Sequence, residues 1–180
     1  MKLALHICCS VCFREPYRAL KASGFEITGI YYNPNIQPYS EYLLRLNALK
    51  VIIKNENLTL LTAENNELNY SDDYFSSKLK SREDQCIKCY NLRLKKTVEE
   101  AKSRSIKYFS TTLLGSPHQK YDIIVEQAEI LSNEYGVEFV HDPKWKESYY
   151  KSKNQSRGLN LYLQKYCGCI YSKGDRKLKD

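Results

Sequence analysis

The sequence predicts an α/β protein with a mainly parallel sheet and helices on both of its faces. Short runs of strand length alternate with segments of helical periodicity, and several of the runs are almost continuous in apolar or β-branched residues. Such runs are typical of buried parallel strands. No repeat or Pro/Gly-rich linker divides the 180 residues, which is an ordinary length for one domain. We therefore expect a single domain over residues 1–180.

Five strands are expected, and apolar or β-branched residues dominate each of them. In chain order they are Lys2–Ile7, Phe25–Tyr32, Leu58–Thr62, Ile106–Thr111 and Val137–Val140. Because strands that alternate with helices form doubly wound sheets, ligands are expected beyond the carboxyl ends of these strands.

Four helices are expected between the strands, at Phe13–Ala22, Ser40–Lys54, Ile87–Ser103 and Pro117–Tyr135. The last has the clearest signals, because apolar residues recur in it at helical spacing. Ser116 is its expected N-cap, Gln119 completes a capping box, and Gly136 closes the final turn.

The cysteines form three groups. They are Cys8, Cys9 and Cys12; Cys86 and Cys89; and Cys167 and Cys169. A cysteine that only fills a core has no reason to stand beside another, whereas metal sites and redox pairs require such spacing. No segment resembles a signal peptide or reaches membrane-spanning length. We therefore expect a cytoplasmic protein with no membrane partner, whose thiols stay reduced and available for metals or catalysis.

The first two groups supply enough sulfur for a metal centre. Cys8 and Cys9 follow the first strand, where the backbone must turn if both thiols are to face one centre. Cys86 and Cys89 are expected at a helix N-terminus, which stabilises thiolates. Four sulfurs suit either tetrahedral zinc or a [4Fe–4S] cluster, and the adjacent Cys-Cys pair favours the cluster. Cys12 is either a further ligand or a small core residue, and its place one helical turn after Cys8 favours the ligand.

Cys167-Gly168-Cys169 is a different kind of site. Two thiols one residue apart form a tight ring when oxidised, and glycine permits the turn. A strained disulfide is easily reduced, which favours a redox-active pair. The alternative is a further pair of metal ligands.

Three other features bear on function. Lys and Arg outnumber Asp and Glu by 28 to 21, the net charge is +7, and there are 16 tyrosines. Such a surface suits RNA, although a compositional bias explains it equally well. No GxGxxG, GxxxxGK[ST] or ATP-binding loop is present. Among the histidines, His6 is expected to be a core residue, His118 to lie at a pocket and His141 to lie in a turn.

Five motifs, in order along the chain, resemble the QueH family of epoxyqueuosine reductases. They are His6–Ser10, Asn33–Pro38 followed by Glu41-Tyr42, Cys86–Leu94, Thr111–Pro117 and Tyr166–Ser172. The resemblance implies a HUP-type Rossmann-like domain. It also implies reduction of the epoxide of epoxyqueuosine, at the wobble position of tRNA, to the cyclopentene of queuosine.

The resemblance further implies the cofactors and the residues that hold them. A [4Fe–4S] cluster is expected on Cys8, Cys9, Cys86 and Cys89. A redox-active disulfide is expected between Cys167 and Cys169. A single iron beside the cluster shares a cysteine ligand with it, and Cys9 and Cys12 are the ligands we assign to that iron.

The expected partners are tRNA and a protein electron donor of the ferredoxin or flavodoxin type, since clusters accept single electrons. Two other functions stay open. Cluster-dependent sulfur transfer to tRNA normally needs an ATP-binding loop, which is not found. A zinc-stabilised RNA-binding module without catalytic activity is the third possibility, and iron and sulfide content separates it from the first two.

Overall fold

Five strands form one sheet in the computed structural model, which describes residues 1–62 and 81–177. The strands are β1 (Lys2–His6), β2 (Glu26–Tyr31), β3 (Thr59–Thr62), β4 (Tyr108–Thr111) and β5 (Glu138–Phe139). All neighbouring pairs are parallel, in the order β3-β2-β1-β4-β5. The predicted parallel α/β sheet is confirmed, and each strand ends within two residues of its expected bounds.

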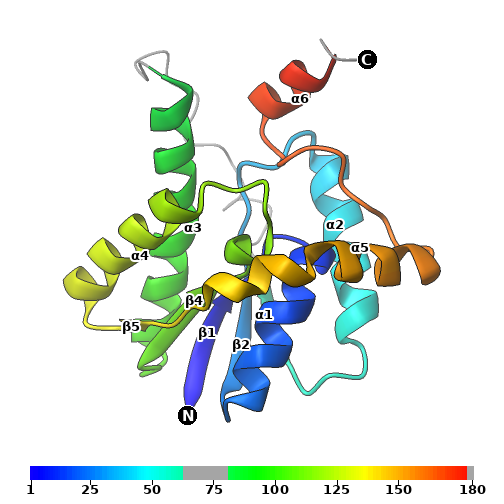
Figure 1. Ribbon diagram of the computed structural model, residues 1–180. Coiled ribbons are helices and arrows are strands. Elements are labelled where there is room, and N and C mark those ends of the chain that lie inside the picture. Colours follow the sequence, from blue (N-terminus) through cyan, green and yellow to red (C-terminus); the bar gives the residue numbers. More distant parts are fainter. Residues whose placement is uncertain (63–80, 178–180) are drawn as a thin grey trace.

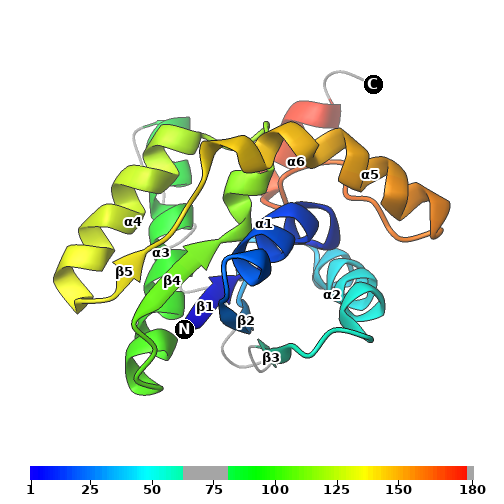
Figure 2. The ribbon, with the colours of Figure 1, turned by 60° about the horizontal axis from the view of Figure 1, so that its bottom comes forward.

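Helices cover both faces of this sheet (Figures 1 and 2). The main ones are α1 (Ser10–Ala22), α2 (Tyr39–Ile53), α3 (Arg82–Ser103) and α4 (Tyr121–Tyr135). α1 packs against α2, whereas α3 packs against α4, β1 and β4. Right-handed crossovers produce this division, because the chain moves from β1 outward to β3 and then returns to β4 on the other side of β1. The central strand β1 is consequently buried from Leu3 to His6.

Two helix starts differ from the prediction. α3 begins at Arg82 because the hydroxyl of Ser81 caps it, accepting a hydrogen bond from the Asp84 amide at 3.1 Å. Cys86 and Cys89 therefore lie beyond its first turn, where amides already donate within the helix. The expectation that these two thiols meet the free amides of a helix N-terminus was wrong.

The start of α3 was thus predicted five residues too late, whereas the start of α4 was predicted too early. The chain after β4 first forms a short 3₁₀ helix, η1 (Thr112–Gly115). Ser116 then accepts a hydrogen bond from the His118 amide at 3.2 Å, which closes a turn rather than capping a helix at Pro117. α4 starts only at Tyr121, and it ends as expected with Gly136 in the left-handed conformation at φ 68°.

The C-terminal third contains helices that the sequence did not predict. η2 (Pro143–Ser148) leads into α5 (Tyr149–Gly158), which lies across α1. Residues 159–169 then return past α2 to α6 (Ile170–Lys177), as Figure 1 shows. α5 buries few side chains and has no apolar stripe, so its sequence lacks the usual helical signal. Among the described residues, no helix is both long and apolar enough to cross a membrane.

Candidate metal and thiol site

Three buried thiols meet where β1 ends and α1 begins. The sulfurs of Cys8, Cys9 and Cys12 all lie within 4.8 Å of one another. Cys9 is the N-cap of α1, and its sulfur accepts a hydrogen bond from the Cys12 amide at 3.4 Å. The Thr112 hydroxyl, which follows β4, accepts from the Cys8 amide at 3.0 Å and lies 3.4 Å from the Cys8 sulfur. The turn at the carboxyl end of β1 thus directs all three thiols to one point.

Hydrogen bonds make Cys9 the most acidic of the three thiols. The thiols of Cys12 and Cys8 both donate to the Cys9 sulfur, which lowers its pKa well below the usual value against the opposing effect of burial. The side-chain amide of Gln164 also donates to this sulfur, at 2.9 Å. The pKa of Cys12 is raised, because its own thiol proton is held by Cys8 and Cys9. A thiolate flanked by two thiols is a suitable donor set for a thiophilic metal.

Cys86 and Cys89 approach the same end of the sheet from α3. The guanidinium of Arg93 donates to the sulfur of Cys89 at 3.0 Å and to its carbonyl oxygen at 3.1 Å. Arg93 and Cys89 are buried, while Cys86 is half-buried. Burial, followed by the charge of Cys89, raises the pKa of Cys86. Arg93 therefore holds a positive charge directly against one of these sulfurs.

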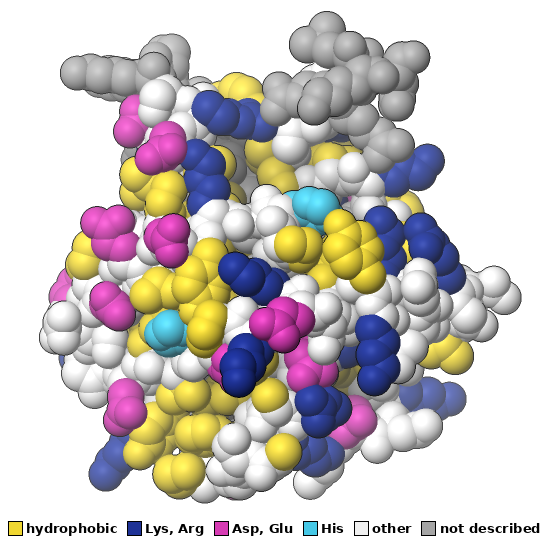
Figure 3. Space-filling view, in the orientation of Figure 1, with side chains coloured by type: hydrophobic (Ala, Val, Ile, Leu, Met, Phe, Trp, Pro, Cys, Tyr) yellow, Lys and Arg dark blue, Asp and Glu magenta, His cyan; other side chains and the backbone are white. Residues whose placement is uncertain are grey.

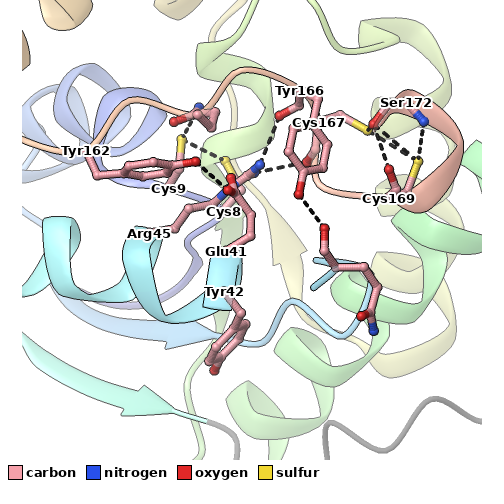
Figure 4. Close-up of polar contacts among 12 residues, drawn as sticks. Cys8, Cys9, Glu41, Tyr42, Arg45, Tyr162, Tyr166, Cys167, Cys169 and Ser172 are labelled. Atoms are coloured by element: carbon pink, nitrogen blue, oxygen red, sulfur yellow. Dashed lines mark hydrogen bonds and ion pairs between the residues drawn. The ribbon is translucent and has the colours of Figure 1, made fainter. Parts of the chain in front are cut away.

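Cys167 and Cys169 form a hydrogen-bonded thiol pair at the start of α6, with their sulfurs 3.5 Å apart (Figure 4). The Cys167 thiol donates to the Cys169 sulfur, and Ser172 adds a hydrogen bond from its amide at 3.4 Å. These bonds lower the pKa of Cys169 to about 5, whereas the pKa of Cys167 is raised. At neutral pH the pair consists of one thiolate and one thiol.

A buried ion pair on α2 holds the loop that carries these two thiols. Arg45 donates to the carbonyl oxygens of Tyr166 and Cys167, at 2.9 and 3.1 Å. It also pairs with Glu41 at 2.8 Å, and Glu41 accepts a further hydrogen bond from the Tyr162 hydroxyl. Figure 4 shows the ion pair between the Cys8–Cys9 turn and the loop. Arg45 thus ties α2 to the thiol loop, while Gln164 of the preceding segment contacts Cys9.

Two neighbouring cavities collect the three cysteine groups. The first, here called the large cavity, has a volume of about 540 Å³ and is lined by Cys8, Cys9, Cys12 and Cys167, among others. The second, here called the small cavity, has a volume of about 30 Å³ and is lined by Cys86, Cys89, Cys167 and Cys169, among others. Arg93 and Cys167 line both. All seven cysteines, which the sequence predicted to be functional, therefore lie at one end of the sheet.

The seven cysteines do not form one compact group. Among the described residues, Cys8, Cys9 and Cys12 form the only group of three or more potential ligands whose atoms are close enough together to hold a single ion. Cys86 and Cys89 instead share the small cavity with the Cys167–Cys169 pair. The predicted four-sulfur set of Cys8, Cys9, Cys86 and Cys89 stays a prediction.

Buried oxygen atoms without partners lie at both cavities. The side-chain oxygen of Asn33, at the large cavity, and that of Asn35, at the small cavity, are buried with no hydrogen-bond partner. Leaving a polar atom unpaired is unfavourable, so both atoms are suited to face a bound group. Together with the thiols, they fit a metal-containing centre at this end of the sheet.

The histidines take secondary roles. His6 is buried and hydrogen-bonded to Thr111 at 2.9 Å and to the Tyr32 carbonyl at 3.2 Å. Burial, and then the charge of Arg93, lowers its pKa to about 3, so it is a neutral core residue, as expected. His118 lines the large cavity, and His141 is hydrogen-bonded to Tyr121.

Sequence reasoning gave no role to Glu41 and Arg93, although both lie in the five motifs, and it did not single out Arg45 or Gln164. The ion pair had one visible signal, because Glu41 and Arg45 are four residues apart on a predicted helix. Gln164 lies in an irregular segment far along the chain from Cys9, and no pattern in the sequence pointed to it.

Thiols gathered beyond the carboxyl ends of parallel strands define an α/β protein with a metal or thiol redox centre. A family model described as Epoxyqueuosine reductase QueH matches residues 3–175. The chain belongs to this family and is accordingly an oxidoreductase.

Individual relatives agree with the family assignment. A protein of Dehalococcoides mccartyi named Epoxyqueuosine reductase QueH is 34% identical over 97% of this chain and 94% of the relative. The protein of the same name from Thermotoga maritima is 30% identical, over 97% and 92%. The one from Helicobacter pylori is 33% identical over 94% of this chain but only 49% of its own length.

Among solved structures, two crystal structures of a deacetylase from the biosynthesis pathway of teicoplanin share the fold. Both have a TM-score of 0.50, with 8% and 9% identity. They cover 87% and 89% of this chain, which in turn covers 84% and 88% of theirs. At this identity the likeness supports the α/β fold alone.

Proposed function

We propose that this protein reduces epoxyqueuosine in tRNA to queuosine, in the cytoplasm, by removing the epoxide oxygen. The observation that supports this most is the arrangement of three cysteine groups around two cavities that share Cys167 and Arg93. In a member of the epoxyqueuosine reductase family, this arrangement supports the proposal of a redox pair beside a thiol-rich metal centre.

The proposed centre is a [4Fe–4S] cluster on Cys8, Cys9, Cys86 and Cys89, with a single iron on Cys9 and Cys12. When bound, these groups supply single electrons and a Lewis acid for the epoxide oxygen. Cys9 suits the shared position, because its sulfur is the most acidic of its group and already accepts several hydrogen bonds.

The proposed reaction consumes two electrons and two protons, converts the epoxide to an alkene and releases water. Oxidation of Cys167 and Cys169 to a disulfide supplies two electrons. At neutral pH the pair holds one proton, on Cys167, because Cys169 has a pKa of about 5. The second proton comes from water. A protein electron carrier of the ferredoxin or flavodoxin type then reduces the disulfide.

Iron and sulfide analysis of protein purified without oxygen tests the metal centre. We expect a brown protein with more than four irons per chain, as a cluster and one iron require. Cys86→Ala should remove the colour, because three sulfurs rarely hold a cubane. Stoichiometric zinc in protein produced with ample iron would contradict the proposed centre and favour a zinc-stabilised RNA-binding module.

A reaction with defined substrate tests the activity. Given tRNA that bears epoxyqueuosine and a strong one-electron donor, the protein should form queuosine without ATP. Mass spectrometry of the digested tRNA should show a nucleoside lighter by one oxygen. Cys167→Ser should retain the cluster absorption and lose repeated turnover. If iron-replete protein leaves the epoxide intact, the proposed function is wrong.

A further inference from the structure

The large cavity is strongly cationic. Its described lining includes Arg45, Arg93, Lys153, Arg157 and Lys165, and no Asp or Glu among the described residues lines it. The whole chain has 21 acidic residues for 28 basic ones, so a lining without any carboxylate is a local feature. Apart from the thiolate of Cys9, the charged side chains of this lining are all cationic, and such a lining attracts ligands of the opposite sign. Its ligand is therefore expected to be an anion.

The five cations fall into a buried pair and an outer, more exposed group. Arg45 and Arg93 are buried and already engaged, with Glu41 and backbone carbonyls in one case and with Cys89 in the other. Arg157 and Lys165 are exposed and Lys153 is half-buried. The outer three thus stand toward the solvent, while the buried Cys8, Cys9 and Cys12 lie deeper.

One face of α5 supplies two of the outer cations. Tyr149, Lys153 and Arg157 are spaced four residues apart, and all three line the large cavity. Lys151 lies on the other side of the same helix and lines a separate cavity against α1. No acidic residue occurs in α5. In Figure 3, Lys and Arg gather over and beside α5, whereas many Asp and Glu side chains lie over α3 and α4 on the left.

We propose that Lys153 and Arg157, together with Lys165 from the chain that follows α5, bind the backbone phosphates of RNA on either side of the nucleotide that enters the large cavity. This inference rests on the proposed function and names the part of the substrate that these residues hold. Phosphodiesters are the anions that an RNA presents on both sides of one base, and Lys and Arg are the side chains that most often contact them. Exposed side chains reach the backbone while the base goes deeper toward the thiols.

Counterion release sets the size of the expected effect. Each phosphate contact to a single strand contributes about 0.7 to the slope of log affinity against log salt. At a physiological ionic strength of about 0.15 M, that slope corresponds to about 4-fold in affinity for each contact. The double variant Lys153→Ala/Arg157→Ala should therefore bind an anticodon stem–loop RNA about 15-fold more weakly. Its salt slope should be smaller by about 1.4.

The matched control is Lys151→Ala, which removes one positive charge from the opposite side of the same helix. Fluorescence anisotropy with a labelled stem–loop RNA, across a salt series, compares the three proteins. Lys151→Ala should keep the wild-type slope, and a helix that merely lost stability would change the melting temperature rather than the slope. If Lys151→Ala and the double variant weaken binding equally per charge removed, the effect is one of net charge and the phosphate site is wrong.

Two further arms separate the remaining explanations. Guanosine monophosphate carries phosphate without a chain, so binding as tight as that of the RNA would show a free-nucleotide site and overturn the inference. Epoxide reduction is measured in parallel. If wild-type protein reduces the epoxide and the double variant binds RNA normally, the phosphate site fails and the proposed function stands. If the double variant loses RNA binding but wild-type protein never reduces the epoxide, the proposed function fails and the phosphate site stands.

Discussion

Gly168 is the position at which a single methyl group should do the most harm to the thiol loop. Its φ of 122° is strained for any residue with a Cβ, which costs about 1–3 kcal/mol. A Cβ there would also stand 2.9 Å from the Cγ1 of Ile36 and 3.3 Å from the Nδ2 of Asn35. Both side chains are buried and have little room to move, so the overlap adds about 1–3 kcal/mol. Gly168→Ala should therefore disfavour the docked loop by about 2–6 kcal/mol.

Hydrogen exchange at one amide reports this directly. The Gln37 amide donates to the Gly168 carbonyl at 2.8 Å, so it is protected only while the loop is docked. A loss of 2 kcal/mol or more corresponds to about 25-fold faster exchange at least. Much of the strain should be released by undocking of the loop, so the sheet amides should stay protected.

Two other glycines allow the backbone strain at Gly168 to be distinguished from the steric overlap of its added Cβ. Gly136 also has a positive φ, of 68°, but nothing lies within 4 Å of its Cβ position, so Gly136→Ala carries strain without overlap. Gly174, inside α6, has neither feature, and Gly174→Ala should leave the exchange of the Gln37 amide unchanged. If Gly168→Ala leaves the exchange of the Gln37 amide unchanged, the close packing of the loop on Ile36 does not hold it in place, and the reasoning is refuted.

Three further results are expected. Alkylation of Cys169, followed by mass spectrometry across a pH series, should show a midpoint near pH 5, and a midpoint near pH 9 would contradict the lowered pKa. Because the pKa of Cys169 in the folded protein lies below the ordinary value of 9, the thiolate stabilises the fold fully above pH 9, and this contribution is lost as the pH falls through 5. Gly115→Ala places a Cβ 2.6 Å from the carbonyl oxygen of Cys12, so it should lower the melting temperature and weaken the binding of cobalt, used as a coloured probe ion, by the thiols of Cys8, Cys9 and Cys12. Unchanged cobalt absorption would contradict this expectation. Arg45→Met leaves Glu41 buried without its ion-pair partner, which should lower the free energy of unfolding by about 3–5 kcal/mol. The double variant Arg45→Met/Glu41→Gln should recover part of that loss in chemical unfolding, and equal stability of the single and double variants would rule out the unpaired charge as the cause.

The sheet and its four principal helices were predictable because their signals are local. Apolar runs and helical periodicity depend on nearby residues, and the left-handed Gly136 ended α4 as expected. The starts of α3 and α4 were less predictable, because several Ser residues compete to be caps. The structure used Ser81 for α3 and placed Ser116 in a turn instead.

The cysteine groups were visible as spacing, but their surroundings were not. Arg93 against Cys89 and Gln164 against Cys9 are contacts that depend on tertiary packing. α5 has a polar sequence and is held across α1 by a few buried residues, such as Tyr149, so neither its existence nor its cationic face followed from periodicity. The grouping of the cysteines was thus predicted more fully than the residues that pack around them.

The hydrogen bond between Gln164 and Cys9 joins residues that are 155 positions apart. At a synthesis rate of about 5–20 residues per second, about 8 to 30 s separate the two on the ribosome. During that interval the sulfurs of Cys8, Cys9 and Cys12 have been made, but the segment that later covers them has not. The order of synthesis therefore leaves the thiols of the first turn open to metal ions, and to oxidants, before the rest of the chain closes over them.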